Sequence, residues 1–482
     1  MAVSRSWKAY RLTYRAEQMK TLANWILAGV SGSVVGLAGA GKSNLLGFLC
    51  HRTEALQSYL APQAGPVALI SVDLNNLLSN TLATFYRVIL RSFYEVRDRF
   101  DQSLQQAIAD LYQENRAARD PFLPQNALRE LLLQFQTQRI QVVLVLDPFD
   151  RFAQTATPQL LDTLRGLRDS FKDTLCYIVG TRQEVIYLFD PAALGEMYEI
   201  LDTHVCWVGP MNESDARQLI AEETHIALAP PNEAEVSHLL TLTGGYPSLL
   251  KAACHWWLAT PDKPAASEWA LALLAERSIQ SRLEEIWAGL TQEERQTLSE
   301  MQKGQTRVAA LAAGEKAGDK KAQEALDNAT LYLERRHRCA LPRLNAKGLC
   351  QRTDTGWRIF ADLFAAYVAN AEGWGSGRIW LDEKTDELYQ GPTLLEDLTP
   401  LERAVLSFLA RNPRVRHTKT DLIVSTWPDE LRQQGVSDDS LYQVIGGLRK
   451  KIEPNPAKPC YIINWRGRPE GGYQFFPEGR PG

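Results

Sequence analysis

The sequence predicts an α/β fold over the first 210 residues, followed by a helical segment and small domains in which helices precede a hairpin. Two patterns predict this: five short apolar runs alternate with helix-like stretches, and after Pro210 mainly helical spacing continues. Strands separated by helices favour a parallel sheet with right-handed crossovers. A chain of 482 residues is also too long for one core and indicates about three domains.

The predicted elements follow from the spacing of apolar residues. Five strands are expected at 33–37, 67–72, 142–146, 175–179 and 205–208. Helices are expected at 42–57, 81–100, 214–224, 233–242 and 248–258. Between 284 and 370 several helices precede a short hairpin around 354–356, which predicts a small winged helix, and 373–377 is a predicted linker.

The composition is that of a globular protein, with 45% hydrophobic and 23% charged residues, which excludes wholesale disorder. No apolar run reaches the roughly 18 residues of a membrane span, and the first residues lack the apolar core of a secretory signal. The seven cysteines are scattered, without a Cys-x-x-Cys pair. We therefore expect a cytoplasmic protein with reduced thiols and no membrane contact.

Charge is distributed unevenly along the chain. The net charge is −4, but from Thr399 onward 13 lysines and arginines outnumber nine acidic residues. A mildly basic tail on an acidic body indicates that a polyanionic partner would bind the tail.

A glycine-rich loop joins the first predicted strand to the first helix. Its sequence, GLAGAGKS, fits the phosphate-loop pattern G-x-x-x-x-G-K-[ST] in the strand–loop–helix context that the pattern needs. Glycines let backbone N–H groups surround phosphates, the lysine neutralises phosphate charge, and the serine ligates Mg²⁺. We predict that ATP or ADP with Mg²⁺ binds at Gly36, Gly39, Ala40, Gly41, Lys42, Ser43 and Asn44. The alternative is a glycine-rich turn without a ligand.

Three polar residues after later strands are the predicted catalytic group. Asp147 ends the third apolar run and is expected to hold Mg²⁺ together with Ser43, although it could simply cap a helix. Pro148 follows it, so the nearest further acid is Asp150, which either polarises the attacking water or caps a turn. Arg182 is expected to sense the γ-phosphate, the alternative being a solvated surface charge. With no acid directly after Asp147, we predict slow hydrolysis.

Further motifs accompany the phosphate loop. They are Gly244-Gly245-Tyr246-Pro247, the spacing from Asp147 to Asp150, and the lead-in Tyr14-Arg15-Ala16-Glu17. Over about residues 10–275 the set resembles the STAND and archaeal-type branch of the AAA+ P-loop ATPases. The resemblance implies a helical lid that closes on the nucleotide, with Pro247 near the adenine or ribose. It also implies a self-associating ATP state and a closed, monomeric ADP state.

The tail carries a second set of motifs. The segment LTPLE begins at Leu398, a helix pattern with the apolar stripe Leu441, Ile445, Leu448 and Ile452 follows, and 461–475 has the pattern of a β-wing. Over about residues 378–478 these resemble the OmpR-like winged helix of response regulators. The residues expected to contact duplex DNA are Gln443, Arg449, Lys450, Arg466 and Arg468.

Two departures from that resemblance weaken the prediction of DNA binding. Gly446 and Gly447 stand where relatives often carry arginines, and each mid-helix glycine costs about 1 kcal/mol relative to alanine. An insertion at 469–471 lengthens the wing and adds the negative charge of Glu470. A protein-binding use of the same fold therefore remains an alternative.

We predict four segments: a P-loop ATPase core over 1–210, a helical lid over 211–280, a first winged helix over 281–372, and a linker with an OmpR-like winged helix over 373–482. The predicted function is an ATP-dependent switch that controls a DNA-binding module, in the simplest case a transcription regulator. One alternative is a AAA+ ATPase that acts on DNA in the manner of origin or transposition ATPases. Another is a defence or signalling sensor whose tail recruits a partner protein.

Overall fold

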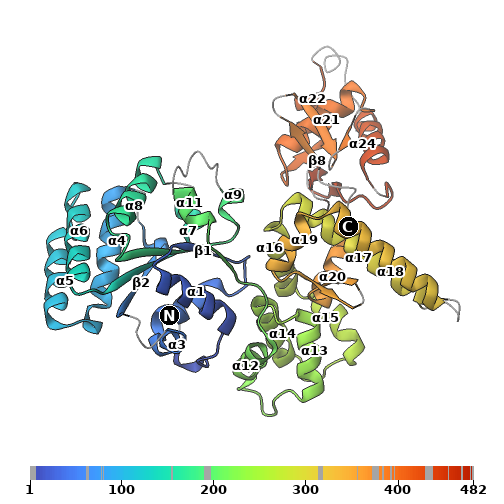
Figure 1. Cartoon of the computed structure of the whole chain (residues 1–482). Helices are drawn as coiled ribbons and strands as arrows, with labels where there is room; N and C mark the ends of the chain where they lie inside the picture. Colours follow the sequence, from blue (N-terminus) through green and yellow to red (C-terminus); the bar gives the residue numbers. More distant parts are fainter. Residues whose placement is uncertain are drawn as a thin grey trace. The chain divides into compact units, whose positions relative to one another are not determined.

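The computed structural model divides into two compact units, Met1–Phe364 and Ala365–Gly482 (Figure 1). The structure describes residues 7–60, 65–77, 79, 81–153, 156–188, 197–312, 318–354, 356–371, 379–382, 385–390, 393–395, 397–428, 438–453, 455–467, 470–477 and 479. Within these ranges, no helix has the length and apolar character needed to cross a membrane.

A five-stranded parallel sheet forms the centre of the first unit, with the strand order β2-β3-β4-β1-β5. The strands are β1 (Gly32–Val35), β2 (Val67–Asp73), β3 (Gln141–Asp147), β4 (Leu175–Thr181) and β5 (Val205–Trp207). All five predicted strands are present, with their ends within two residues of expectation. Every residue of β1 and β4 is buried, as expected for strands whose two faces are covered by helices.

Helices cover both faces of this sheet. They are α1 (Ala16–Ala28), α2 (Lys42–His51), α3 (Thr53–Gln57), α4 (Leu82–Glu95), α5 (Gln102–Asn115), α6 (Phe122–Thr137), α7 (Phe149–Ala153), α8 (Pro158–Ser170), α9 (Val185–Leu188) and α11 (Met197–Asp202). Apolar residues of α4, α5, α6 and α8 form one core with alternate residues of β3, and these helices lie together beside the sheet in Figure 1. Helices α5 and α6 are absent from the prediction. Helix α5 begins where the Asp101 carboxylate accepts a hydrogen bond from the backbone N–H of Leu104.

A helical segment follows the sheet. It consists of α12 (Glu213–Thr224), α13 (Glu233–Thr243), α14 (Pro247–Ala259) and α15 (Trp269–Ala275), close to the three predicted helices. Asn232 and Glu235 form a capping box at the start of α13, and Gly244, with φ of 58°, ends it.

The rest of the first unit has the helices and hairpin of the predicted first winged helix. Its elements are α16 (Arg277–Ala288), α17 (Gln292–Ala312), α18 (Gly318–Arg336), α19 (Ala340–Ala346), β6 (Cys350–Thr353) and β7 (Gly356–Ile359). Strands β6 and β7 pair antiparallel. Helix α20 (Asp362–Ala371) contains the boundary between the two units.

The second unit has two three-stranded sheets, β10-β9-β8 and β11-β13-β12, packed with helices. Its elements are β8 (Ile379–Asp382), β9 (Glu387–Gln390), β10 (Thr393–Leu394), α21 (Pro400–Arg411), β11 (Arg416–Thr418), α22 (Lys419–Thr426), α24 (Asp438–Ile452), β12 (Ile462–Trp465) and β13 (Gly472–Phe475). The predicted apolar stripe of α24 is fully buried. The LTPLE motif has a physical cause, because Thr399 and Glu402 form a capping box with Pro400 in the first turn of α21.

Candidate functional site

The loop between β1 and α2 has a conformation that its glycines permit. Gly39 and Gly41 have φ angles of 78° and 90°, a region that other residues rarely adopt. A Cβ at Gly36 would lie 3.0 Å from the carbonyl oxygen of Val208. Ala40 and Lys42 are buried, Asn44 is half-buried, and Ser43 is exposed in the first turn of α2. The predicted cofactor-binding residues between Gly36 and Asn44 therefore lie in this loop and in the first turn of α2.

The predicted lysine and carboxylate of this site contact each other directly. The Lys42 ammonium forms an ion pair with Oδ1 of Asp147, where β3 ends. Gly180 of the neighbouring strand β4 leaves the space for this pair, because a Cβ there would lie 2.8 Å from Lys42 Nζ and would overlap Asp147 Oδ1. Both charged side chains are largely shielded from solvent, with exposed fractions of 8% and 18%.

The other two predicted catalytic residues also lie together. Arg182 Nε is 3.7 Å from Oδ2 of Asp150, which links the turn after β4 to α7. Asp150 is 7% exposed and Arg182 is 64% exposed, so the arginine can reach a ligand from the solvent side. Oδ1 of Asp150 is buried and accepts no hydrogen bond from any residue that the structure describes.

The start of α14 lies directly on the phosphate loop. The Tyr246 hydroxyl donates to the carbonyl oxygen of Ala38 at 2.8 Å, and the backbone N–H of Ser248 donates to that of Gly39 at 3.2 Å. A Cβ at Gly41 would lie 3.4 Å from Cγ of Pro247. The GGYP segment therefore contacts the phosphate loop, with Pro247 beside Gly41, and its role in nucleotide binding stays a prediction.

Arg15 joins the phosphate loop to the segment after β5. Its guanidinium donates to the carbonyl oxygens of Ala40 at 2.8 Å, Gly209 at 2.8 Å and Pro210 at 2.9 Å. Arg15 is 2% exposed. Its backbone has a positive φ of 53°, which is uncommon for a residue with a side chain. The backbone N–H of Arg15 donates to Asp215 at 2.9 Å, and burial raises the pKa of that carboxyl group despite this bond and the nearby Arg15 charge.

A small cavity lies between the N-terminal segment, α2, α12 and α14. It is lined by Tyr10, Tyr14, Asn44, Met211, Asp215, Gln218, Leu219, Glu222, Pro247 and Lys251. The volume open to the centre of a water molecule is about 10 Å³, which is room for about one water. In this conformation the cavity is thus too small for a nucleobase.

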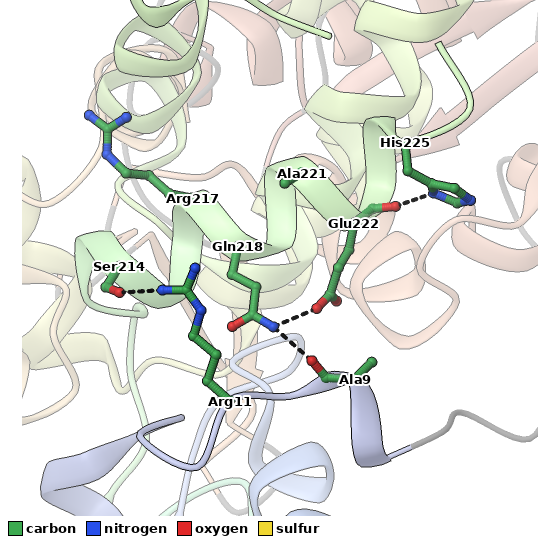
Figure 2. Close-up of a pocket in the computed structure, with 8 residues that line it drawn as sticks. All are labelled: Ala9, Arg11, Ser214, Arg217, Gln218, Ala221, Glu222 and His225. Atoms are coloured by element: carbon green, nitrogen blue, oxygen red, sulfur yellow. Dashed lines mark hydrogen bonds between the residues drawn. The ribbon is translucent and has the colours of Figure 1, made fainter.

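A larger hollow lies beside this cavity, on the solvent side of α12. Figure 2 shows that the N-terminal segment contacts α12 there: the Gln218 side chain bonds to the carbonyl oxygen of Ala9 and to Glu222, and Arg11 bonds to Ser214. The hollow has a volume of about 730 Å³. Gln218 and Glu222 line both spaces, so α12 separates the small cavity from open solvent.

The segment from α16 to β7 also contacts the phosphate loop. A Cβ at Gly289, at the end of α16, would lie 2.8 Å from Cδ2 of the loop residue Leu37. The Gln183 side chain, next to Arg182, donates to the carbonyl oxygen of Gly289 at 2.7 Å. Lys347 and Glu294 form an ion pair of 2.5 Å with exposed fractions of 2% and 0%, and the Lys347 ammonium lies 5.7 Å from the Trp207 ring of β5.

The terminal winged helix presents some of its predicted DNA-contacting residues and uses another internally. Gln443 and Lys450 on α24 and Arg466 after β12 are exposed. Arg449 instead donates to the carbonyl oxygen of Ile462 at 2.5 Å and to Asn464 Oδ1 at 2.8 Å, and burial lowers the pKa of its guanidinium. Arg468 lies outside the described residues.

The two departures from the winged-helix resemblance have separate structural explanations. A Cβ at Gly447 would overlap Oε1 of Glu402, whose Oε2 accepts a hydrogen bond from Lys451 at 2.6 Å, so this glycine permits close contact between α21 and α24. Among the residues that the structure describes, none has an atom within 4 Å of the corresponding position at Gly446. Glu470 accepts hydrogen bonds from the backbone N–H and the hydroxyl of Thr420, in the first turn of α22.

Several residues of this site are not among the predicted set. Gly180 and Gly289 act through the absence of a side chain, and Ser248 and Gln183 act through one hydrogen bond each. Their contacts join segments far apart in the sequence, so no local spacing marks them. Arg15 belongs to the lead-in motif, so the sequence does single it out. The motif does not indicate that the Arg15 side chain contacts the phosphate loop.

Comparison with known families finds two matching segments. Residues 395–475 match the family described as "Transcriptional regulatory protein, C terminal". The terminal domain is similar to the OmpR-like winged helix. This confirms the predicted resemblance of the tail. Residues 19–182 match the family described as "Nephrocystin 3, N-terminal", a segment that contains the phosphate loop and the ends of β3 and β4.

Solved structures of low sequence identity also align with the chain. A Walker-type ATPase of Pyrococcus abyssi is 15% identical, with 73% of this chain and 95% of that chain covered and a TM-score of 0.40. The ORC2 protein of Aeropyrum pernix in its ADP form is 15% identical, with 75% and 94% covered and a TM-score of 0.39. The ORC1 protein of Aeropyrum pernix in complex with DNA is 15% identical, with 73% and 91% covered and a TM-score of 0.30. Comparison with curated protein sequences finds no match.

Proposed function

We propose that this protein is an ATP-dependent switch in which a phosphate-loop ATPase controls the C-terminal DNA-binding domain, most simply as a transcription regulator. One observation carries the proposal: consecutive residues of the phosphate loop contact two other elements. Ala38 and Gly39 accept hydrogen bonds from the start of α14, and Leu37 packs on Gly289 of the first winged helix. A ligand that reshapes this loop therefore acts on both elements at once.

The residues present fit ATP or ADP with Mg²⁺. The glycines with positive φ and the N-terminus of α2 suit a phosphate chain, and Lys42 supplies a positive charge beside it. Ser43 and Asp147 would supply a hydroxyl and a carboxylate oxygen to Mg²⁺, the ligand types that this ion prefers. Bound Mg²⁺ would neutralise phosphate charge. Asp150 would orient water, and Arg182 would contact the terminal phosphate from the solvent side.

Nucleotide entry would require movement, which supports a switching role. Lys42 is already paired with Asp147, and the cavity beside Pro247 has room for about one water. A bound nucleotide would have to replace the carboxylate as the partner of Lys42 and separate the residues that line this cavity. Because these residues come from the N-terminal segment, α2, α12 and α14, binding energy would be converted into displacement of α12 and α14.

DNA binding would be the output of the switch. Gln443, Lys450 and Arg466 are exposed on the domain that matches the transcriptional-regulator family. Gln443 would contact a base edge, and the basic residues would contact phosphates. An ATP state that brings several copies together would bind DNA more tightly because linked sites gain effective concentration.

Calorimetric titration of ATP and ADP into the wild type and Lys42→Ala tests the proposal. Loss of measurable nucleotide binding by a folded Lys42→Ala variant would support it. Arg11→Ala is the matched control, since it removes a cation that has one exposed 3.4 Å bond and lies outside the loop. Unchanged ATP affinity in folded Lys42→Ala would contradict the assignment. A basal turnover of tens per second would favour a DNA-translocating or remodelling ATPase over a switch.

A further inference from the structure

The basic residues of the first winged helix divide into those with partners and those without. Arg343 lies over the Tyr187 ring at 5.2 Å, and the Lys347 ammonium lies 5.7 Å from the Trp207 ring, so α19 and the residue after it direct their basic groups toward the ATPase core. In the hairpin, Arg352 pairs with Glu334 at 3.1 Å, and Arg358 lies 4.0 Å from Asp362. These four cations are engaged within the unit.

Arg335, Arg336 and Arg338 are different. All three are exposed, and none of their guanidinium groups forms an ion pair or hydrogen bond with any other residue in the described part of the chain. Tyr332 lies three and four positions before the first two, on the same face of α18, with its side chain 51% exposed. We name these four residues the arginine patch. With Leu331, three of them line an open hollow of about 530 Å³.

The patch is held on a rigid support. Between its arginines, His337 is 4% exposed and lies 2.7 Å from Oε2 of Glu300 on α17. Burial acts to raise the pKa of Glu300, but hydrogen bonds from His337, Gln296 and Tyr332 outweigh it, so the carboxylate keeps its charge. The end of α18 is therefore fixed to α17, and the arginines project from a defined surface.

Complementing the helix dipole explains only part of this arrangement. Arg335 and Arg336 lie in the last turn of α18, where cations are favourable. Arg338 lies beyond the helix end, where the dipole does not account for it. The Tyr332 hydroxyl bonds to Glu300, which fixes the ring in place, yet Tyr332 and Leu331 stay 51% and 46% exposed beside the three arginines. Guanidinium groups next to an exposed aromatic ring are instead suited to phosphate and nucleic-acid contact.

We propose that the arginine patch is a second nucleic-acid contact surface, which binds the phosphate backbone of duplex DNA without reading sequence. Three guanidinium groups can each pair with phosphate oxygens, and contacts of this kind position a protein on DNA without carrying sequence information. This inference rests on the proposed function in one respect, namely that the polyanion is duplex DNA. The patch is distinct from the exposed residues of α24 and the wing.

The test is fluorescence anisotropy of the full chain on duplex DNA of mixed sequence over a salt series. The triple variant Arg335→Ala, Arg336→Ala, Arg338→Ala should lower affinity at least about tenfold at low salt and flatten the plot of log affinity against log salt by about two to three units. The corresponding triple lysine variant keeps the charge and should retain most of the slope. A control triple, Arg91→Ala, Arg165→Ala, Arg217→Ala, removes the same charge from residues already in ion pairs and should leave the slope unchanged.

A parallel variant, Lys450→Ala with Arg466→Ala, separates this inference from the proposed function. If that pair abolishes binding while the arginine-patch triple leaves affinity and slope unchanged, the patch is not a DNA surface and the terminal domain alone binds. If the patch triple reduces binding and the pair does not, the patch is supported and the terminal domain loses its proposed role. Equal losses in the patch triple and the control triple would overturn the patch, because net charge alone would then explain them.

Discussion

Arg15 and Ala40 are joined by a hydrogen bond of 2.8 Å from a buried guanidinium to a phosphate-loop carbonyl, although 25 positions separate them. The same guanidinium holds Gly209 and Pro210, where the chain leaves the sheet for α12. One side chain thus fixes the position of the loop relative to the start of the helical segment. The loop, the segment after β5 and the start of α14 form one connected structure around the proposed nucleotide site.

Arg15→Ala should weaken both this structure and nucleotide binding. Removing three hydrogen bonds from a charged group, two buried and one part-buried, should cost about 3 kcal/mol of unfolding free energy, because the carbonyl groups lose their donors. Thermal unfolding and calorimetric ADP titration measure the two effects. Arg11→Ala, which removes one exposed bond, should change neither measurably. Equal effects of the two substitutions would contradict the role of Arg15.

Gly180→Ala should abolish nucleotide binding while the protein stays folded. The added Cβ would overlap the Asp147 carboxylate and approach Lys42, so both side chains would have to leave their present positions. Gly166→Ala is the matched control, because no described residue has an atom within 4 Å of a Cβ at that position in α8. The control should increase stability by up to about 1 kcal/mol and keep nucleotide affinity. Normal ATP affinity in Gly180→Ala would show that the Lys42–Asp147 geometry is dispensable.

The two adjacent glycines of α24 should respond in opposite directions to alanine. Gly446→Ala should stabilise the second unit by about 1 kcal/mol, since the position is open and alanine favours a helix. Gly447→Ala should destabilise it, because the methyl group would displace Glu402 from its bond with Lys451. Unfolding in guanidinium chloride, monitored by hydrogen exchange of the α24 amides, measures the stability change of each variant. Stabilisation by both substitutions would contradict the packing described for Gly447.

Glu402 should make the second unit sensitive to acid. Burial acts to raise its pKa, but bonds from Lys451 and Thr399 outweigh it and hold the pKa below the ordinary value of 4.5. A lowered folded-state pKa contributes stability that is present above the unfolded value of about 4.5 and lost as the pH falls through the folded value.

Glu402→Gln should remove this dependence. Hydrogen exchange of α21 and α24 amides, corrected for the intrinsic effect of pH, should show that protection falls between pH 6.5 and pH 3 by a smaller factor in the variant than in the wild type. Lys451→Met should have a similar effect, since it removes the partner that lowers the pKa. An acid dependence identical in wild type and Glu402→Gln would rule out this carboxylate as the cause.

Local sequence patterns were sufficient for the elements with short-range causes. The continuous apolar run at 142–146 predicts β3 because both faces of that strand are buried, and the stripe from Leu441 to Ile452 predicts the buried face of α24. The phosphate loop can be identified from the sequence because the glycines and the lysine that form it lie within eight consecutive residues. Helices α5 and α6 are less evident, because their apolar residues fill a core shared with α4 and the sheet.

Contacts over long sequence separations could not be predicted in this way. Arg449 is predicted to contact DNA, which requires an exposed guanidinium. Its guanidinium instead donates to the carbonyl oxygen of Ile462 on β12, a partner that the sequence of α24 does not reveal. The contact of Leu37 with Gly289 joins residues that are far apart in the sequence and depends on how α16 packs beside the phosphate loop. Such contacts follow from tertiary packing, for which sequence spacing carries no signal.

Nucleotide control of DNA binding is the central claim, and one titration tests it most directly. Full-length protein is titrated into labelled duplex DNA with a slowly hydrolysed ATP analogue, with ADP, or without nucleotide, and Lys42→Ala is measured in parallel. We expect the analogue to tighten DNA binding at least about tenfold relative to ADP, because linked tails gain effective concentration, and we expect Lys42→Ala to bind DNA with the same affinity in all three conditions. Wild-type affinity that does not differ between the analogue and ADP, at nucleotide concentrations shown to saturate the protein, would contradict the switch.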